Sequence, residues 1–267
     1  MINEVLLGVI NMPSFAIHAI CGNEILKEMN LSENAKKSFI IANIIPDVSR
    51  VTGFKKKDAK EKRKSIQDNK TSTHFRTDHN AILFYPDLDM FLEKYSGNVK
   101  SSITSFAYFF HLYTDYYFFR KFLTSVLSFY DEDMQKTKNK NDVKFVKVNR
   151  TGEIIEYSKV ISKDNDYSIY RDYSILNNYL LNKYELKIDY DDLFEYIDQG
   201  KFHIDIEETK SIYAYYAVFK MKKYLQDEKV KNSDLRIIAP EELDKFIKDV
   251  VKSFKKNYGY FINSYLK

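Results

Sequence analysis

Apolar residues recur every three or four positions along most of this chain, which is the spacing of helices that bury one face. The clearest stretch, SFAYFFHLYTDYYFFRKFL, lies within a helix that we expect from about Val99 to Tyr130. Aromatic residues surround its axis, as is typical of a helix buried among others, so it is the predicted central helix of the fold. Further helices are predicted at residues 13–28, 32–43, 86–95, 168–184, 190–199, 205–227 and 241–265.

The apolar pattern changes to strict alternation after Asp133. The segments VKFVKV and IIEYSKV flank NRTGE, where Gly152 suits a turn, and together they predict a β-hairpin near residues 143–160. The expected fold class is therefore all-α, a mainly helical bundle with one small hairpin insert. We expect an N-terminal extension at 1–11 (Met12 is an alternative start), a helical region at 12–133 and a helical C-terminal region at 143–267. The last two regions form either separate domains or one continuous domain.

The composition is that of a folded protein, because 22 Tyr and 20 Phe supply large apolar surfaces. Only 7 Gly and 4 Pro occur, which favours long helices over a many-turned β-sandwich. The single cysteine, Cys21, cannot form an intramolecular disulfide and favours a reducing compartment. No run of about 18 apolar residues occurs, and the first residues lack the basic segment of a signal peptide. We expect a soluble cytoplasmic protein without a transmembrane segment.

His111 and Asp115 are the sharpest chemical signal in the chain. Their i, i+4 spacing places an imidazole and a carboxylate on one face of the aromatic helix. Burying a charge there is costly unless it is paired or binds a metal. The pair therefore indicates either a metal site or a buried His–Asp hydrogen bond without a metal.

Other candidate ligands are individually weak. His18 lies on or beside the apolar face of the first helix, Asp47 follows Pro46 in ANIIPDVSR, and His74 follows a basic loop in STHF. A lone histidine is more often a core residue, and Pro-Asp more often only a turn. Candidate additional ligands are His79, His203 and Glu207, the last two having H-x-x-x-E spacing.

Taken in order, His18, Asp47, His74, His111 and Asp115 resemble the metal ligands of the bacterial zinc-dependent phospholipase C family, whose all-helical fold is shared with fungal single-strand nucleases. The matching segments are MPSFAIHAICGNEIL, ANIIPDVSR, STHF and FFHLYTDYYFF, within residues 12–130. The resemblance implies a helical phospholipase C/nuclease-like fold and zinc as the cofactor, with another divalent metal as the alternative. The chain departs from the family in having no Trp and no H-x-x-x-E pair at the family's position, so we expect one or two metal ions.

Such a site suits hydrolysis of phosphate esters, because zinc with an open position activates water and polarises a phosphoryl group. Asp47 is a ligand or the group that accepts the proton of that water, and Asp115 could bridge two ions. The basic loop at 55–64 is either a solvated surface loop or a phosphate-attracting rim formed by Lys55, Lys56, Lys57 and Arg63. The expected substrate is a phospholipid head group or a small phosphodiester. The alternatives are an inactive metal-stabilised binding module and, third, a single-strand nuclease.

Overall fold

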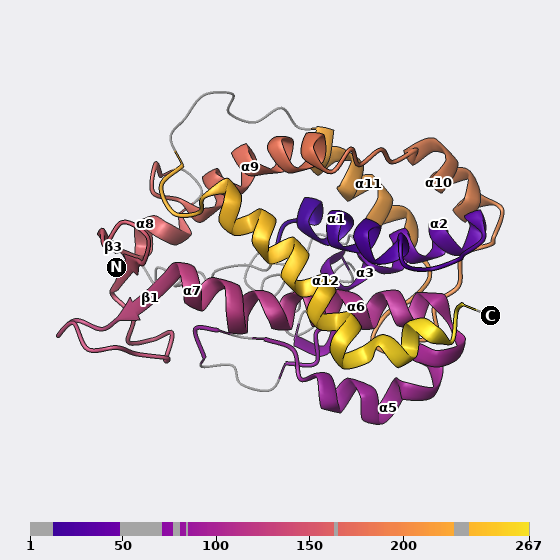
Figure 1. The fold of residues 1–267 in the computed structure, drawn as a ribbon, viewed down its shortest axis with the longest axis horizontal. Coiled ribbons are helices and arrows are strands. Elements are labelled where there is room, and N and C mark those ends of the chain that lie inside the picture. The colour runs from indigo at the N-terminus through magenta and orange to yellow at the C-terminus, as the bar shows by residue number, and fades with distance from the viewer. Residues whose placement is uncertain are drawn as a thin grey trace, which may run out of the picture.

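The computed structural model describes residues 13–48, 71–76, 81–83, 85–162, 165–226 and 235–266, and its described part is mostly helical (Figure 1). The expected mainly helical class is confirmed, and a three-stranded antiparallel sheet accompanies the helices. The predicted extension at 1–11 lies outside the described residues. In chain order the elements are α1 (Phe15–Leu26), α2 (Glu33–Ala42), α3 (Ile45–Val48), α5 (Leu88–Ser101), α6 (Ile103–Tyr117), the π-helical η1 (Phe118–Leu123), α7 (Thr124–Val126), β1 (Leu127–Tyr130), β2 (Phe145–Val148), β3 (Ile154–Glu156), α8 (Tyr157–Ile161), α9 (Ile169–Lys183), α10 (Tyr190–Asp198), α11 (Tyr213–Gln226) and α12 (Pro240–Asn263).

Serine side chains set the starts of the first two helices. The Ser14 hydroxyl accepts a hydrogen bond from the Ile17 amide, and Ser32 does the same for Ala35. These caps satisfy amides that have no partner within the helix. Both helices therefore begin close to where the sequence predicts, and α2 ends against Asn43 as expected.

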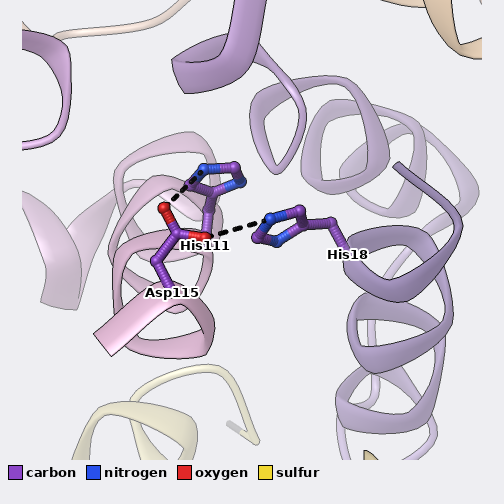
Figure 2. A group of neighbouring side chains, drawn as sticks. All are labelled: His18, His111 and Asp115. Atoms are coloured by element: carbon purple, nitrogen blue, oxygen red, sulfur yellow. Dashed lines mark ion pairs between the residues drawn. The ribbon is translucent and has the colours of Figure 1, made fainter. Parts of the chain in front are cut away.

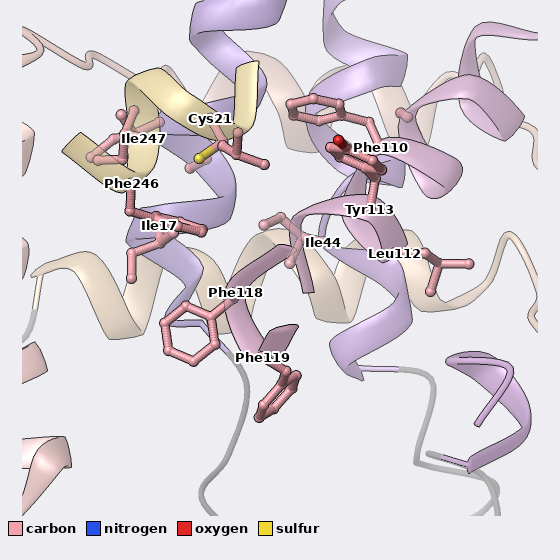
Figure 3. Packing of buried hydrophobic residues seen from close by; sticks show 14 of the residues in the cluster. Ile17, Cys21, Ile44, Phe110, Leu112, Tyr113, Phe118, Phe119, Phe246 and Ile247 are labelled. Carbon is pink, nitrogen blue, oxygen red and sulfur yellow. The ribbon is translucent and has the colours of Figure 1, made fainter. Parts of the chain in front are cut away.

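The aromatic helix α6 occupies the centre of the fold, as predicted. It contacts α1, α2, α3, α5 and α12, and its residues from Thr104 to Asp115 are all buried. Figure 3 shows side chains of α6 and η1 in the same apolar core as side chains of α1 and α12. A helix enclosed in this way can hold polar groups only if they satisfy one another or bind a ligand.

The prediction of one helix over 99–130 is wrong at both ends. The extended backbone of Ser102, with φ −125° and ψ 118°, separates α5 from α6. The helix beginning near Pro86 is consequently longer than predicted, since α5 is capped by Asp87 and ends at Ser101. At the other end, Leu127–Tyr130 pairs with β2 as a strand, because it buries alternate residues against the sheet.

The predicted hairpin is present as β2 and β3, with Gly152 in the turn at φ +77°. Only Gly adopts this left-handed backbone without a steric cost. The sheet order is β1-β2-β3, so the structure adds one strand to the expected pair. The predicted second strand is shorter than expected, since residues from Tyr157 onward form α8.

The second half of the chain packs against the first. α1 contacts α9, α11 and α12, and one hydrophobic core includes residues from both halves. α9, α10 and α12 match their predicted ranges closely, whereas α11 begins at Tyr213 instead of 205. Residues 201–206 are not helical; there the Ile204 amide donates to the Ser211 hydroxyl.

Two buried carboxylates fasten α9 and α12. Asp172 of α9 accepts hydrogen bonds from the backbone amides of residues 236, 237 and 238 at 3.2, 2.7 and 2.8 Å, just before α12 begins. Asp244 of α12 contacts Lys183 and Tyr184 at the end of α9 and Lys248 on its own helix. Burial raises the pKa of Asp244, but these three donors outweigh it and lower the pKa to about 2. None of the described helices is both long and apolar enough to cross a membrane.

Candidate metal centre

Three imidazoles and two carboxylates from separate segments meet inside the fold. His18 comes from α1, Asp47 from α3, His74 from residues 71–76, and His111 with Asp115 from α6. The His18 Nε2 lies 3.3 Å from the Asp115 Oδ1 and 3.9 Å from the Asp47 Oδ2. The His74 Nε2 lies 3.7 Å from the Asp47 Oδ1 and 3.6 Å from the Asp115 Oδ2. The structure therefore brings together all five residues that the sequence order selected.

His111 faces both other imidazoles. Its ring stacks on that of His18 with centroids 3.9 Å apart, and its Nε2 lies 3.4 Å from the Nε2 of His74. The same Nε2 lies 3.8 Å from the Asp115 Oδ2. Figure 2 shows His18 and Asp115 approaching from neighbouring helices, with His111 beside them.

Outer hydrogen bonds orient two of the histidines. The Nδ1 of His111 lies 2.7 Å from the carbonyl oxygen of Asn43, which can only accept, so Nδ1 carries the proton. The Thr73 hydroxyl donates to the carbonyl of Pro46 and lies 3.0 Å from the Nδ1 of His74, from which it accepts. Both histidines consequently present an Nε2 lone pair to the centre. This is the arrangement in which histidines bind metals.

Three buried atoms of the cluster residues lack hydrogen-bond partners among the described residues. Neither ring nitrogen of His18 forms a hydrogen bond, nor does the Oδ1 of Asp115, although all three atoms are buried. A buried polar atom without a partner costs about 1–3 kcal/mol. A cation between the His18 Nε2 and the Asp115 Oδ1 would satisfy both atoms, so these residues fit a metal ion.

Burial favours the protonation states that metal binding needs. Desolvation lowers the pKa of His74 to about 4, with the charge of Arg76 adding to it, and lowers that of His111 to about 3. Burial alone would raise the pKa of Asp115, but the nearby imidazoles of His18, His111 and His74 outweigh it and lower the pKa. At neutral pH His74 and His111 are thus neutral and the carboxylate of Asp115 is ionised, which are the ligating forms of these groups.

The spacing of the donor atoms also fits zinc. Atoms that bind one zinc ion at about 2.0–2.2 Å lie no more than about 4.4 Å apart. The separations given above run from 3.3 to 3.9 Å. Two overlapping triads, His18–His111–Asp115 and Asp47–His74–His111, each have donor atoms within 4.8 Å of one another.

The sequence analysis missed Arg76, which belongs to the same centre. Its Nη2 lies 3.5 Å from the Asp115 Oδ2, and its guanidinium carbon lies 5.5 Å from the centroid of the Phe119 ring. Phe75 between His74 and Arg76 has φ +50°, and its buried ring packs on Phe91. The sequence signal was slight, since an arginine beside a basic loop is usually exposed.

The remaining predicted residues do not join this centre. His203 is exposed and pairs with Asp205 at 2.7 Å, and Glu207 pairs with Lys94 at 2.6 Å. Their H-x-x-x-E spacing does not place them on one helix face, because residues 203–206 are not helical. The candidate ligand His79 and the predicted rim of Lys55, Lys56, Lys57 and Arg63 lie outside the described residues.

Of the five cluster side chains, that of Asp47 retains some exposure to solvent. Its side chain is 9% exposed, whereas those of the other four residues are fully buried. A separate groove of about 530 Å³ is lined by Tyr113, Tyr116 and Arg120, among others, and by none of the five cluster residues. At 100° per residue, Tyr113 and Tyr116 lie on the face of α6 opposite His111 and Asp115, and Arg120 follows in η1.

Comparisons with protein-family models, with curated proteins and with solved structures find no match, so the family resemblance rests on the motif residues alone.

Proposed function

We propose that this protein is a metal-dependent hydrolase of phosphate esters, resembling phospholipase C, with zinc as the metal. The observation that carries the proposal is the convergence of three imidazoles and two carboxylates from separate segments, with two triads of donor atoms each within 4.8 Å. His18, Asp47, His74, His111 and Asp115 would hold the ion. When bound, zinc acts as a Lewis acid that lowers the pKa of water and polarises a phosphoryl oxygen.

Residues of the protein would orient the metal ligands and accept the proton of the attacking water. Hydrogen bonds to Asn43 and Thr73 hold His111 and His74 with their Nε2 atoms toward the centre. Asp47 is the member of the cluster with residual exposure, so its carboxylate is placed to accept a proton from an attacking water. The substrate we propose is a phospholipid head group or another small phosphodiester.

A second candidate is a metal-stabilised binding module without catalysis. The burial of four of the five side chains favours it, because a substrate must reach the ion through the side of Asp47. The single-strand nuclease reading has less support. Tyr113, which could have stacked on a base, is buried and packs on Phe254.

Hydrolysis of bis-nitrophenyl phosphate by the zinc-loaded protein tests the proposal. Asp115→Asn keeps the side-chain shape but removes a charge that the ion needs, and it should lower the rate by at least ~100-fold. His203→Ala, an exposed histidine paired with Asp205, is the matched control and should retain the wild-type rate. If the metal-loaded wild-type protein does not turn over lipid, nucleotide or nucleic-acid esters, the proposed hydrolase function is contradicted. The metal-stabilised binding module would then be the supported function.

A further inference from the structure

The arginine beside the metal centre has no role in the function proposed so far. Arg76 is a buried residue, with a side chain only 6% exposed, and its Nη2 lies 3.5 Å from the Asp115 Oδ2. The backbone of its neighbours in the chain explains why the Arg76 side chain points toward Asp115. Phe75 adopts a left-handed backbone and packs its ring on Phe91 and Tyr95, so that His74 and Arg76 on either side of it both reach Asp115.

The donor atoms of the centre suit one ion better than two. The two possible ligand triads share His111. An imidazole Nε2 has one lone pair and binds one ion, and the other ring nitrogen of His111 donates to the carbonyl of Asn43. The two triads therefore cannot each bind a separate ion at the same time. Two ions about 3.5–4 Å apart would need two complete donor sets, whereas the two triads found among the described residues share His111.

The charges of the buried groups point the same way. Asp47 and Asp115 contribute two negative charges, Arg76 contributes one positive charge, and the histidines are ligands in their neutral form. One divalent ion leaves a net charge of +1, which an anionic ester can neutralise. A second divalent ion would leave +3 in a site that is almost fully buried, and an excess charge of that size is costly to bury.

We propose that the centre holds a single divalent ion and that the guanidinium of Arg76 supplies the second positive charge, binding the phosphate group of the substrate beside that ion. The inference rests on the proposed hydrolase and specifies how its site recognises phosphate. The planar fork of an arginine matches two phosphate oxygens, which a lysine cannot match. The ring of Phe119, 5.5 Å from the guanidinium carbon, lies against the cation.

Two measurements test this inference. The first is the zinc content per chain after saturation and desalting, for which we expect one ion in the wild type. The second is calorimetric titration of the zinc-loaded protein with inorganic phosphate. Arg76→Ala should weaken phosphate binding by at least ~10-fold, since it removes charge-assisted hydrogen bonds. Arg76→Lys keeps the positive charge but not the planar fork of donors. Its phosphate affinity should therefore lie between those of the wild type and Arg76→Ala.

Arg120→Ala is the matched control, because this exposed arginine of η1 lines a separate groove that contains none of the five cluster residues, and its loss should leave phosphate binding unchanged. Two zinc ions in the wild-type chain, or an undiminished phosphate affinity in zinc-loaded Arg76→Lys, would overturn the inference while leaving the hydrolase intact. A wild-type protein that takes up no zinc would overturn the proposed function and this inference with it. If Arg76→Ala does not fold, the wild-type stoichiometry and the lysine variant still decide the question.

Discussion

Removal of the metal ion with a chelator should lower the melting temperature of this protein, and the size of the shift follows from the buried donor atoms. The His18 Nε2 and the Asp115 Oδ1 face each other at 3.3 Å and have no other polar partner that satisfies them among the described residues. Each such atom costs about 1–3 kcal/mol, so an ion that satisfies both contributes about 2–6 kcal/mol to the free energy of unfolding.

Mass action gives a figure within that range. An ion present at about 100 times its dissociation constant stabilises the folded chain by about 2.7 kcal/mol. In a protein of this size, each kcal/mol changes the melting temperature by about 2–4 °C. Differential scanning fluorimetry with and without chelator should therefore show a shift of about 5–10 °C.

The variants make this measurement specific to the centre. In Asp115→Asn the chelator should cause almost no shift, because the ion is no longer held. In His203→Ala, whose histidine is exposed and paired with Asp205, the full shift should remain. An unchanged wild-type melting curve, after elemental analysis has confirmed that the metal is gone, would refute the reasoning.

Three further predictions concern the scaffold around the centre. Gly22→Ala should destabilise the protein by about 1–3 kcal/mol in urea unfolding, since the added Cβ would lie 2.7 Å from the Asn43 side chain. Gly97→Ala in α5 is the control: its added Cβ meets nothing within 4 Å, so the change should be neutral or stabilising by up to about 1 kcal/mol. Asp172→Ala leaves three backbone amides without their acceptor and should cost about 3–5 kcal/mol by the same assay, with a smaller loss in the asparagine variant, and equal stability of all three proteins would contradict this role. The pKa of Asp244 is lowered in the folded state to about 2, so its stabilisation is complete above its unfolded pKa of about 4 and is lost as the pH falls toward 2. Asp244→Asn should accordingly be less stable than the wild type at pH ~6 and closely match it near pH ~2, and a difference that did not depend on pH would argue against the linkage.

Local signals predicted the starts of the first two helices well, but not those of α6 and α11. Ser14 and Ser32 cap helices because a side-chain hydroxyl satisfies nearby amides, and no distant contact is needed. The aromatic content of α6 predicted its burial for an equally local reason. The strand Leu127–Tyr130 was missed because its partner, β2, lies more than a dozen residues further along the chain and only pairing distinguishes it from the end of a helix.

The residues of the candidate centre likewise include some that local sequence signals identified and one that they did not. His111 and Asp115 are recognisable from their i, i+4 spacing, and the order of the five residues suggested that they meet. Their role as metal ligands remains a prediction. Arg76 could not be found in this manner, because its burial depends on the turn at Phe75 and on the position of Phe119, neither of which has a local signature.

The central claim, that these five side chains bind a divalent metal, is tested most directly by anomalous scattering from a crystal grown with zinc. Data collected on either side of the zinc absorption edge should show one peak at the cluster, within about 2.0–2.2 Å of the donor atoms of at least one of the two triads, His18–His111–Asp115 and Asp47–His74–His111. The peak should be absent from crystals of Asp115→Asn. No anomalous peak at this cluster in the wild-type crystal, with zinc present in the solution, would contradict the account.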